Sequence, residues 1–466
     1  MLFSSLPFLY WFLPVVLLLY FAAPRPLKNT VLLLSSLFFY AWGEPRFVLV
    51  MLASILVSYV LGLLLERCRE RPGGRWLLAL SVCLHLAALG YFKYADFFLR
   101  SFSQVTGLSV PLLGVTLPIG ISFYTFQIIS YLVDVYRGEV PAQRNLIHLA
   151  AYVAMFPQLI AGPIVRYSDV ARELDSRRHS TEQAARGARR FLVGLSKKVL
   201  IANVLYQLMT VFQQSTQPTV LFHWIYAICC VLQIYFDFSG YSDMAIGLGL
   251  ILGFHFAENF DYPCISRSVT EFWRRWHISL GSWFRDYVYI PLGGSRVTPA
   301  RQLRNILAVW LLTGLWHGAA WNFVLWGLLF ALLLMAEKRF LLPVLKKHSL
   351  LSRVYMLLVL PVSFVLFNAG SVQEALSSVG AMFGLGGLPL WNAETLYYLR
   401  SYAVVLVIAI LGATPYPARL LHRWEESRTG SRLLAAAEPV ALCLLLLVNT
   451  AFLVDGSYNP FLYFRF

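Results

Sequence analysis

Twelve long runs of this chain contain no Asp, Glu, Lys or Arg, and they set the strongest limit on its fold. An α-helix needs roughly 20 mainly apolar residues to cross a bilayer, and several runs reach or exceed that length. They are 1–24, 29–43, 47–65, 76–92, 101–133, 145–165, 199–236, 305–336, 354–373, 375–393, 401–418 and 439–454. Their number and lengths predict an all-α polytopic membrane protein with about 10–12 crossings and additional re-entrant or interfacial helices.

The composition supports the same fold class. Of 466 residues, 59% are hydrophobic and only 13% are charged, whereas soluble domains carry about 25% charged residues. A soluble globular protein, a single-pass receptor, a disordered chain and a membrane β-barrel with alternating strands are therefore excluded. No linker-like segment or fixed-period repeat divides the sequence, so we expect a single domain over 1–466.

The formal net charge of +15 does not require a nucleic-acid partner. In so apolar a chain, Lys and Arg must lie in loops, where they orient the protein and contact membrane lipids. The first 24 residues have no basic segment before the apolar run, and Pro24-Arg25-Pro26 is typical of a helix end, so we expect a retained membrane helix. Six cysteines without a C-x-x-C motif predict buried apolar thiols.

An amphipathic helix is predicted in the basic segment 267–304. Its apolar positions recur at helical spacing: Val269, Phe272, Trp273, Trp276, Leu280, Trp283 and Phe284. Ser268 and Glu271 are spaced as a capping box at its start. A basic, Trp-rich helix of this kind is typical of the membrane interface. Such a helix can be an interfacial support, or His277 within it can take part in chemistry, and the pattern leaves both open.

His317 is the histidine whose position most strongly indicates function. It lies twelve residues into the run 305–336, so in an unbroken helix it would be ~18 Å along the axis, near the middle of the bilayer. Ionisable groups at that depth usually mark a reactive site or pathway, although a histidine bonded to a neighbouring helix is the structural alternative. A neutral imidazole can act as a general base. In the same helix, Thr313, Gly314 and Trp321 would share its face.

The chain offers no convincing nucleophile of its own. It contains no G-x-S-x-G motif, and nothing around Cys264 indicates a lowered thiol pKa. We therefore expect direct attack by an acceptor hydroxyl. It also contains no D-x-D motif, and no metal site is expected.

Two further motifs have structural explanations. Asp237 and Asp243 lie six residues apart and would face different directions on a helix. They favour helix-end capping around Gly240, with Asp237 also a candidate for a buried polar network. Gly247-x-Gly249-x-x-x-Gly253 lacks the spacing and setting of a nucleotide site and predicts close helix packing.

Several motifs together resemble one known family. Trp316-His-Gly-Ala-Ala-Trp-Asn-Phe323 resembles the histidine motif of the membrane-bound O-acyltransferases. Further segments are similar to its alginate O-acetyltransferase branch, in order along nearly the whole chain: 39–45, 120–126, 156–166, 237–247, 258–263, 270–280, 283–294 and 458–466.

The resemblance implies that His317 is the essential histidine and His277 an accessory one. It also implies a bundle of about 11 transmembrane helices around a central tunnel, in a bacterial cytoplasmic (inner) membrane. An acyl thioester would arrive from the cytoplasm, and a separate extracytoplasmic acetyltransferase would complete the transfer to a polysaccharide. Many relatives carry a second histidine where this chain has Phe330; thirteen residues beyond His317, it should lie several helical turns away.

The leading hypothesis is acyl transfer, most simply of acetyl from acetyl-CoA, with no bound cofactor. His317 would be the general base and His277 would position or polarise a reactant. The candidate substrate contacts are Trp316, Trp321, Asn322, Asp237, Arg274, Arg275 and Arg285. The arginines suit donor phosphates or lipid headgroups equally well. Two rivals remain: D-alanyl transfer to teichoic acid from an acyl carrier, and a lipid or polysaccharide transporter with His317 as a proton relay.

Overall fold

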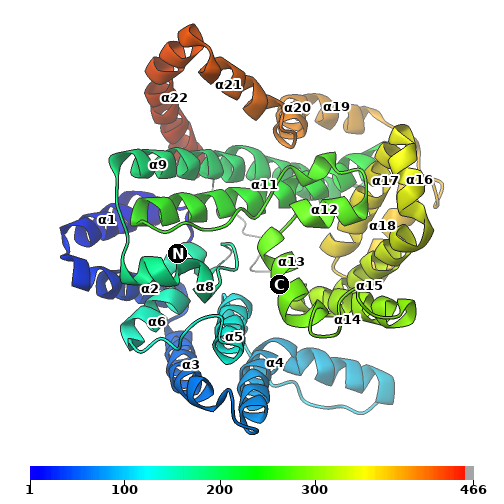
Figure 1. Cartoon of the computed structure of the whole chain (residues 1–466). Helices are drawn as coiled ribbons and strands as arrows, with labels where there is room; N and C mark the ends of the chain where they lie inside the picture. The colour runs from blue at the N-terminus through cyan, green and yellow to red at the C-terminus, as the bar shows by residue number, and fades with distance from the viewer. Residues whose placement is uncertain (161, 457–466) are drawn as a thin grey trace. The chain divides into compact units, whose positions relative to one another are not determined.

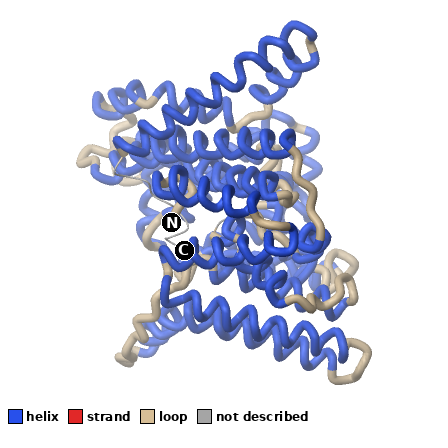
Figure 2. The backbone as a smooth tube through the Cα atoms, turned by 90° about the vertical axis from the view of Figure 1, so that its left-hand side faces the viewer, coloured by secondary structure: helices blue, strands red, loops and turns tan. Residues whose placement is uncertain are grey.

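The computed structural model describes residues 1–160 and 162–456. Every regular element in these ranges is a helix, and helices joined by loops make up the whole described chain (Figure 2). The all-α prediction is thus confirmed for this part. The motif at 458–466 lies outside the described residues.

Contacts between residues divide the chain into two compact units. The first contains Met1–Phe191 and Ser242–Ala257, and the second contains Leu192–Tyr241 and the described residues from Glu258 onward. Two of the three boundaries fall inside the continuous helices Thr181–Ser196 and Val220–Leu252, and the third lies in the loop between Leu252 and Pro263. Whether the chain behaves as one domain, as its composition predicts, stays a prediction.

The first unit is built from the N-terminal helices. They are η1 (Phe8–Phe12), α1 (Leu13–Ala22), η2 (Arg25–Leu27), α2 (Lys28–Gly43), η3 (Pro45–Phe47), α3 (Val48–Cys68), α4 (Gly74–Thr106), α5 (Ile121–Arg137), α6 (Leu146–Ala154), α7 (Phe156–Leu159), α8 (Tyr167–Asp175) and most of α9 (Thr181–Ser196). The basic segment from Arg166 to Lys198 is therefore largely helical.

The second unit contains the candidate site. Its helices are η4 (Lys197–Ala202), α10 (Asn203–Gln214), most of α11 (Val220–Leu252), η5 (Pro263–Ile265), α12 (Val269–Arg275), α13 (Ile278–Phe284), η6 (Arg285–Tyr289), α14 (Pro299–His317), α15 (Trp321–Ala336), η7 (Glu337–Leu341), α16 (Leu342–Lys347), α17 (Ser349–Asn368), α18 (Val372–Met382), α19 (Ala393–Ser401), α20 (Ala403–Gly412), α21 (Tyr416–Glu426) and α22 (Arg428–Asp455).

Six helices in the described ranges are long and apolar enough to cross a membrane. They are Pro45–Cys68, Gly74–Thr106, Thr181–Gln214, Val220–Leu252, Ser349–Asn368 and Arg428–Asp455. A seventh crossing results if α19 and α20, bent by 58°, form one span. There are more charge-free runs than candidate spans, partly because a helix can be interrupted within a run. The run 101–133, for example, includes a non-helical stretch before Ile121. The count of about 11 stays a prediction, since it needs shorter helices to cross as well.

The cysteine prediction is only partly correct. All six cysteines are free thiols, and Cys229 and Cys230 are buried as expected. Cys83 and Cys443 are exposed instead. Both lie on candidate membrane spans, where the bilayer can cover an apolar side chain that no protein contact buries.

Close helix packing at Gly247 is confirmed within the first unit. A Cβ at this position would meet the backbone carbonyl oxygen of Gly187 at 2.5 Å and the backbone nitrogen of Phe191 at 2.8 Å. Only glycine therefore lets α11 and α9 approach so closely here.

A helix end at Gly240 was expected, and that prediction is wrong. Helix α11 continues through this residue to Leu252. Gly240 instead faces the backbone of η4, because a Cβ there would meet the Gly194 carbonyl oxygen at 2.7 Å and the Lys198 nitrogen at 3.2 Å. The close approach leads to an ion pair one helical turn away, with 2.6 Å between Lys198 Nζ and Asp237 Oδ1. Both side chains are buried, so Asp237 belongs to a buried polar pair.

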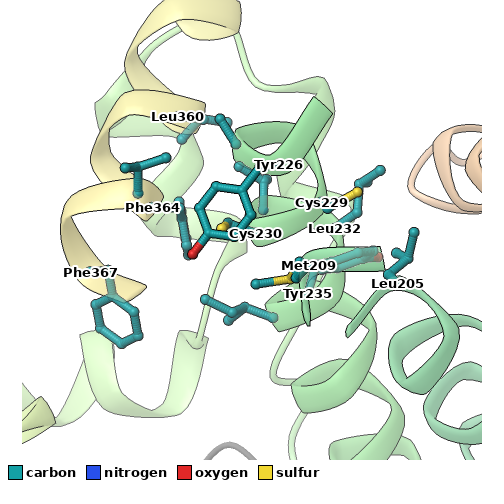
Figure 3. Close-up of a cluster of buried hydrophobic side chains, with 14 of the residues drawn as sticks. Leu205, Met209, Tyr226, Cys229, Cys230, Leu232, Tyr235, Leu360, Phe364 and Phe367 are labelled. Atoms are coloured by element: carbon teal, nitrogen blue, oxygen red, sulfur yellow. The ribbon is translucent and has the colours of Figure 1, made fainter. Parts of the chain in front are cut away.

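The core of the second unit is formed largely by α11 and α17. Tyr226 and Cys230 from α11 lie among Leu360 and Phe364 from α17, as Figure 3 shows. Phe367 extends this core to the end of α17, where the candidate site begins.

We predict that Asp237→Asn lowers the free energy of unfolding in detergent micelles by about 3–5 kcal/mol, because it leaves the Lys198 ammonium buried without its carboxylate. The double variant Lys198→Met/Asp237→Leu should recover most of this loss, since apolar residues of similar volume replace the pair. Glu182→Gln, which breaks an exposed pair with Arg186, should cost less than about 1 kcal/mol. A double variant as unstable as the single one would contradict the interpretation.

Candidate functional site

The run 305–336 is a helical hairpin rather than one continuous helix. Helix α14 ends at His317, Gly318 is extended with φ −169°, and α15 begins at Trp321. The two helices lie side by side (Figure 1). A Cβ on Gly314 would collide with the backbone carbonyl of Phe323, so this glycine permits the close contact, as its sequence setting suggested. Helix α14 is unbroken from Asn305 to His317, so His317 does lie ~18 Å along its axis, but it lies at the end of the helix and not within a longer one. Its depth in the bilayer stays a prediction.

Aromatic rings enclose the His317 imidazole. Its centroid lies 5.0 Å from that of Trp316, 5.1 Å from that of Trp326 and 5.3 Å from that of Phe367. The side chain is buried. Phe330 packs on Trp326 with 5.0 Å between centroids. Because α15 folds back along α14, only the Trp326 ring separates Phe330 from His317. The expectation that Phe330 lies several helical turns away is wrong.

The predicted amphipathic helix is interrupted at His277. Helix α12 ends at Arg275, α13 begins at Ile278, and His277 between them has a left-handed backbone with φ 45°. This conformation costs a non-glycine residue on the order of 1–3 kcal/mol and needs support from its surroundings. Two backbone hydrogen bonds provide that support: Ile278 N donates to Asn259 O at 3.0 Å, and Asp261 N donates to Arg275 O at 2.9 Å.

The start of α12 is capped by two groups. Ser268 Oγ accepts from Glu271 N at 3.0 Å, which confirms the serine half of the predicted capping box. The Glu271 carboxylate accepts from Arg267 N at 2.9 Å instead of from Ser268 N. Glu337, from the end of the α15 hairpin, accepts from Val269 N at 2.6 Å and from Thr270 N at 2.8 Å. Its side chain also accepts from Thr270 Oγ1 at 2.6 Å and is fully buried. The carboxylate therefore attaches α12 to the α14–α15 hairpin, which turns directly after His317.

Asn259 determines which nitrogen of His277 carries the proton. Its Oδ1 accepts from the backbone N–H of Ser279 at 3.2 Å and from Ser279 Oγ at 2.9 Å. A backbone N–H can only donate, so the atom facing it is the amide oxygen. The same oxygen lies 3.1 Å from His277 Nδ1, which must then be the N–H of the ring. In the neutral ring, Nε2 keeps the lone pair, and it has no hydrogen-bond partner among the described residues.

The surroundings of His277 favour this neutral form. Burial lowers the pKa of His277 well below its ordinary value, and the nearby charge of His317 lowers it further. The two histidines are joined through an aromatic ring, since Trp316 contacts His277 at 5.7 Å and His317 at 5.0 Å between centroids. The ring of Phe238 also packs against His277, with 4.6 Å between the centroids. The structure thus brings the two predicted histidines together around Trp316.

A cavity of about 660 Å³ lies beside His277. Trp273, Trp276 and Trp310 contribute apolar lining, while Thr313 adds a hydroxyl. Its cations are Arg274, Arg285 and Lys338, and no Asp or Glu is among the described lining residues. The cavity is therefore suited to a ligand with an apolar part and an anionic group.

The predicted arginines divide between this cavity and other positions. Arg274 and Arg285 line the cavity, although Arg285 Nε also donates to Asp286 at 2.6 Å. Arg275 does not line it. Its guanidinium pairs with Glu271 at 3.1 Å and Asp261 at 2.8 Å, and this pairing supports the chain around the His277 break.

Three other predicted substrate contacts lie away from the positions expected for them. Trp321 is 52% exposed at the start of α15, and a separate helix carries it rather than the His317 face of α14. Asn322 is buried, and its Nδ2 donates to the backbone oxygens of Phe367 and Ala369 at 3.4 and 3.0 Å. Asp237 is paired with Lys198. Neither Asn322 nor Asp237 is among the described residues that line the cavity beside His277.

Sequence reasoning assigned no role to Asn259, Glu337, Lys338 or Phe367. Asn259 lies within the motif 258–263. The motif therefore identified this segment but did not indicate that Asn259 contacts His277. Glu337 ends a charge-free run, and its contact with Thr270 joins residues 67 positions apart in the chain. Such long-range contacts leave no local pattern in the sequence.

We predict that Glu337→Gln lowers the free energy of unfolding by about 1–3 kcal/mol, because an amide nitrogen must then face backbone N–H donors. Unfolding in detergent micelles measures this loss. Glu374→Gln is the matched control, since Glu374 also accepts a backbone N–H, from Gly370 at 2.9 Å, but is exposed. Equal stability of the two variants would contradict a special role for Glu337.

Comparison with known proteins agrees with the motifs. The chain is 40% identical over 500 residues to the "Probable alginate O-acetylase AlgI" of Azotobacter vinelandii, and 41% identical over 492 residues to that of Pseudomonas putida, with 100% of each chain covered. It is 31% identical over 519 residues to the "Peptidoglycan O-acetyltransferase" of Helicobacter pylori, covering 100% of this chain and 98% of that protein. Residues 137–369 match the MBOAT family. The chain therefore belongs to the membrane-bound O-acyltransferase family and is a multi-pass membrane enzyme.

Proposed function

We propose that this O-acyltransferase moves an acetyl group from acetyl-CoA toward the hydroxyl groups of a cell-surface polysaccharide, with an extracytoplasmic acetyltransferase completing the final transfer. The observation that carries the proposal is the pair of buried histidines that contact Trp316. One of them, His277, lines the cavity that is also lined by Arg274, Arg285 and Lys338. Two relatives that align along the full chain, a probable alginate O-acetylase and a peptidoglycan O-acetyltransferase, support a polysaccharide acceptor.

In the proposed reaction, the acceptor hydroxyl attacks the thioester carbonyl directly. His317 takes the hydroxyl proton, a C–O bond forms, the C–S bond breaks, and CoA leaves as a thiolate that is then protonated. A covalent enzyme intermediate on cysteine is not favoured, because burial raises the pKa of Cys264, the cysteine near this region, to about 12.

The contact with Asn259 narrows the role of His277. With Nδ1–H donating to Asn259, neutral His277 offers only an acceptor at Nε2 and cannot polarise a carbonyl through that nitrogen. We therefore assign it the positioning of a group that carries a hydrogen, such as the acceptor hydroxyl. Arg274 and Lys338 would attract the phosphates of the donor.

The rest of the proposal concerns the membrane in which the enzyme lies, the path of the acetyl group and the protein partner. The enzyme would lie in a bacterial inner membrane, pass acetyl through a central tunnel between about 11 crossings, and deliver it to an extracytoplasmic acetyltransferase partner. The full-length similarity to alginate O-acetylases supports this arrangement.

Replacing His317 tests the proposal directly. We predict that His317→Ala lowers acetyl transfer from acetyl-CoA by roughly 10²–10⁴-fold, the usual contribution of a general base. Transfer is measured with purified protein in proteoliposomes, and unfolding confirms that the variant is folded. His422→Ala, an exposed histidine paired with Glu426, should match wild type. A folded His317→Ala protein with the wild-type rate, a donor restricted to an acyl carrier, or substrate transport without any acyl donor would each refute the proposal.

The pH dependence tests the role of His277. Both His277 and the general base His317 must be neutral for transfer. Burial lowers the pKa of His277, so its ring stays neutral as pH drops from 8 to the ordinary histidine value of about 6.5, and its titration does not limit the wild-type rate there. In Asn259→Asp, the new carboxylate beside Nδ1 should raise the pKa of His277 and move the acidic fall in rate to higher pH. Asn259→Ala provides the comparison without a charge. Identical profiles for wild type and Asn259→Asp would contradict this role.

A further inference from the structure

A second cavity of about 670 Å³ lies in the second unit and does not include either histidine. Helix α12 contributes to both cavities through different side chains. Thr270 and Arg274 line the first, whereas Glu271 and Arg275 line the second; Arg267, just before the helix, also lines the second. Residues four apart share one side of a helix, so α12 is a wall between two separate binding spaces.

Three arginines in this second cavity have no carboxylate partner. Arg267, Arg353 and Arg419 are exposed, and no described Asp or Glu pairs with any of them. Glu271, the acidic lining residue, already pairs with Arg275 at 3.1 Å. The lining of the cavity therefore keeps an uncompensated positive charge, which suits a phosphate group.

Much of the remaining lining is apolar, and two candidate membrane spans contribute to it. Leu232 lies on α11, while Met356 and Leu360 lie on α17. From Arg353 to Leu360, the lining of α17 extends ~10 Å along the helix axis. Leu357, between them, is 69% exposed, so the apolar side of the cavity opens where a membrane span faces its surroundings.

We propose that this cavity binds an anionic phospholipid of the bilayer. The phosphate would lie among Arg267, Arg353 and Arg419, and the start of an acyl chain would lie against Leu357 and Leu360. The argument is charge complementarity: basic side chains attract anionic headgroups, and an apolar wall within a membrane span accepts hydrocarbon. A soluble phosphate compound would use the arginines but would leave the apolar wall exposed.

Native mass spectrometry of the full-length protein tests this proposal. The protein is purified in detergent and incubated with phosphatidylglycerol or with phosphatidylcholine of the same chain length. We expect wild type to retain phosphatidylglycerol at least 10-fold better. The variant Arg267→Gln/Arg353→Gln/Arg419→Gln should lose this preference. The control Arg423→Gln/Arg428→Gln/Arg432→Gln removes equal charge from exposed positions outside the cavity and should behave like wild type.

A second variant tests the apolar wall and does not depend on the arginines. Leu357→Trp adds volume at an exposed position, so the fold should be kept while retention of phosphatidylglycerol falls. Displacement of the lipid by added CoA would overturn the proposal, because it would assign the arginines to a soluble phosphate compound. Unchanged retention in the triple arginine variant, or no preference in wild type, would also overturn it.

Discussion

The candidate site depends on the contact between α14 and α15. Gly314 and Gly327 let the two helices touch backbone to backbone, and the chain reverses directly after His317. This reversal places Trp326 from α15 against the imidazole. The same helix then delivers Glu337 to the start of α12. A larger residue at either glycine would separate the helices and displace all of these contacts together.

Buried polar groups in this unit hold the backbone in conformations that helix propensity alone does not favour. Asn259 accepts from three groups around the strained residue His277. Glu337 satisfies backbone donors that a helix start leaves without partners. Because unpaired polar groups are costly away from water, these interactions determine the geometry strongly. The cavity beside His277 thus has rigid walls, which is what positioning for acyl transfer requires.

Helix α12 connects two different environments. One side faces the cavity with His277, and another faces the cavity with unpaired arginines. Its ends are held by Glu337 and by the Arg275 ion pairs. A ligand in either cavity would therefore contact the same short, firmly held helix.

The sequence by itself determined the fold class and the family, and it identified His277 and His317 as candidate site residues. Charge-free runs require helices in a membrane, and the motifs around His277 and His317 are local enough to be recognised. Only the tertiary structure decided where the helices break, which side chains line the cavities, and that His277 presents Nε2 as an acceptor. Those features depend on contacts such as Glu337 with Thr270 and Asn259 with His277. Hydrogen bonding and close packing join residues far apart in the chain, and hydrophobic periodicity reports only on near neighbours.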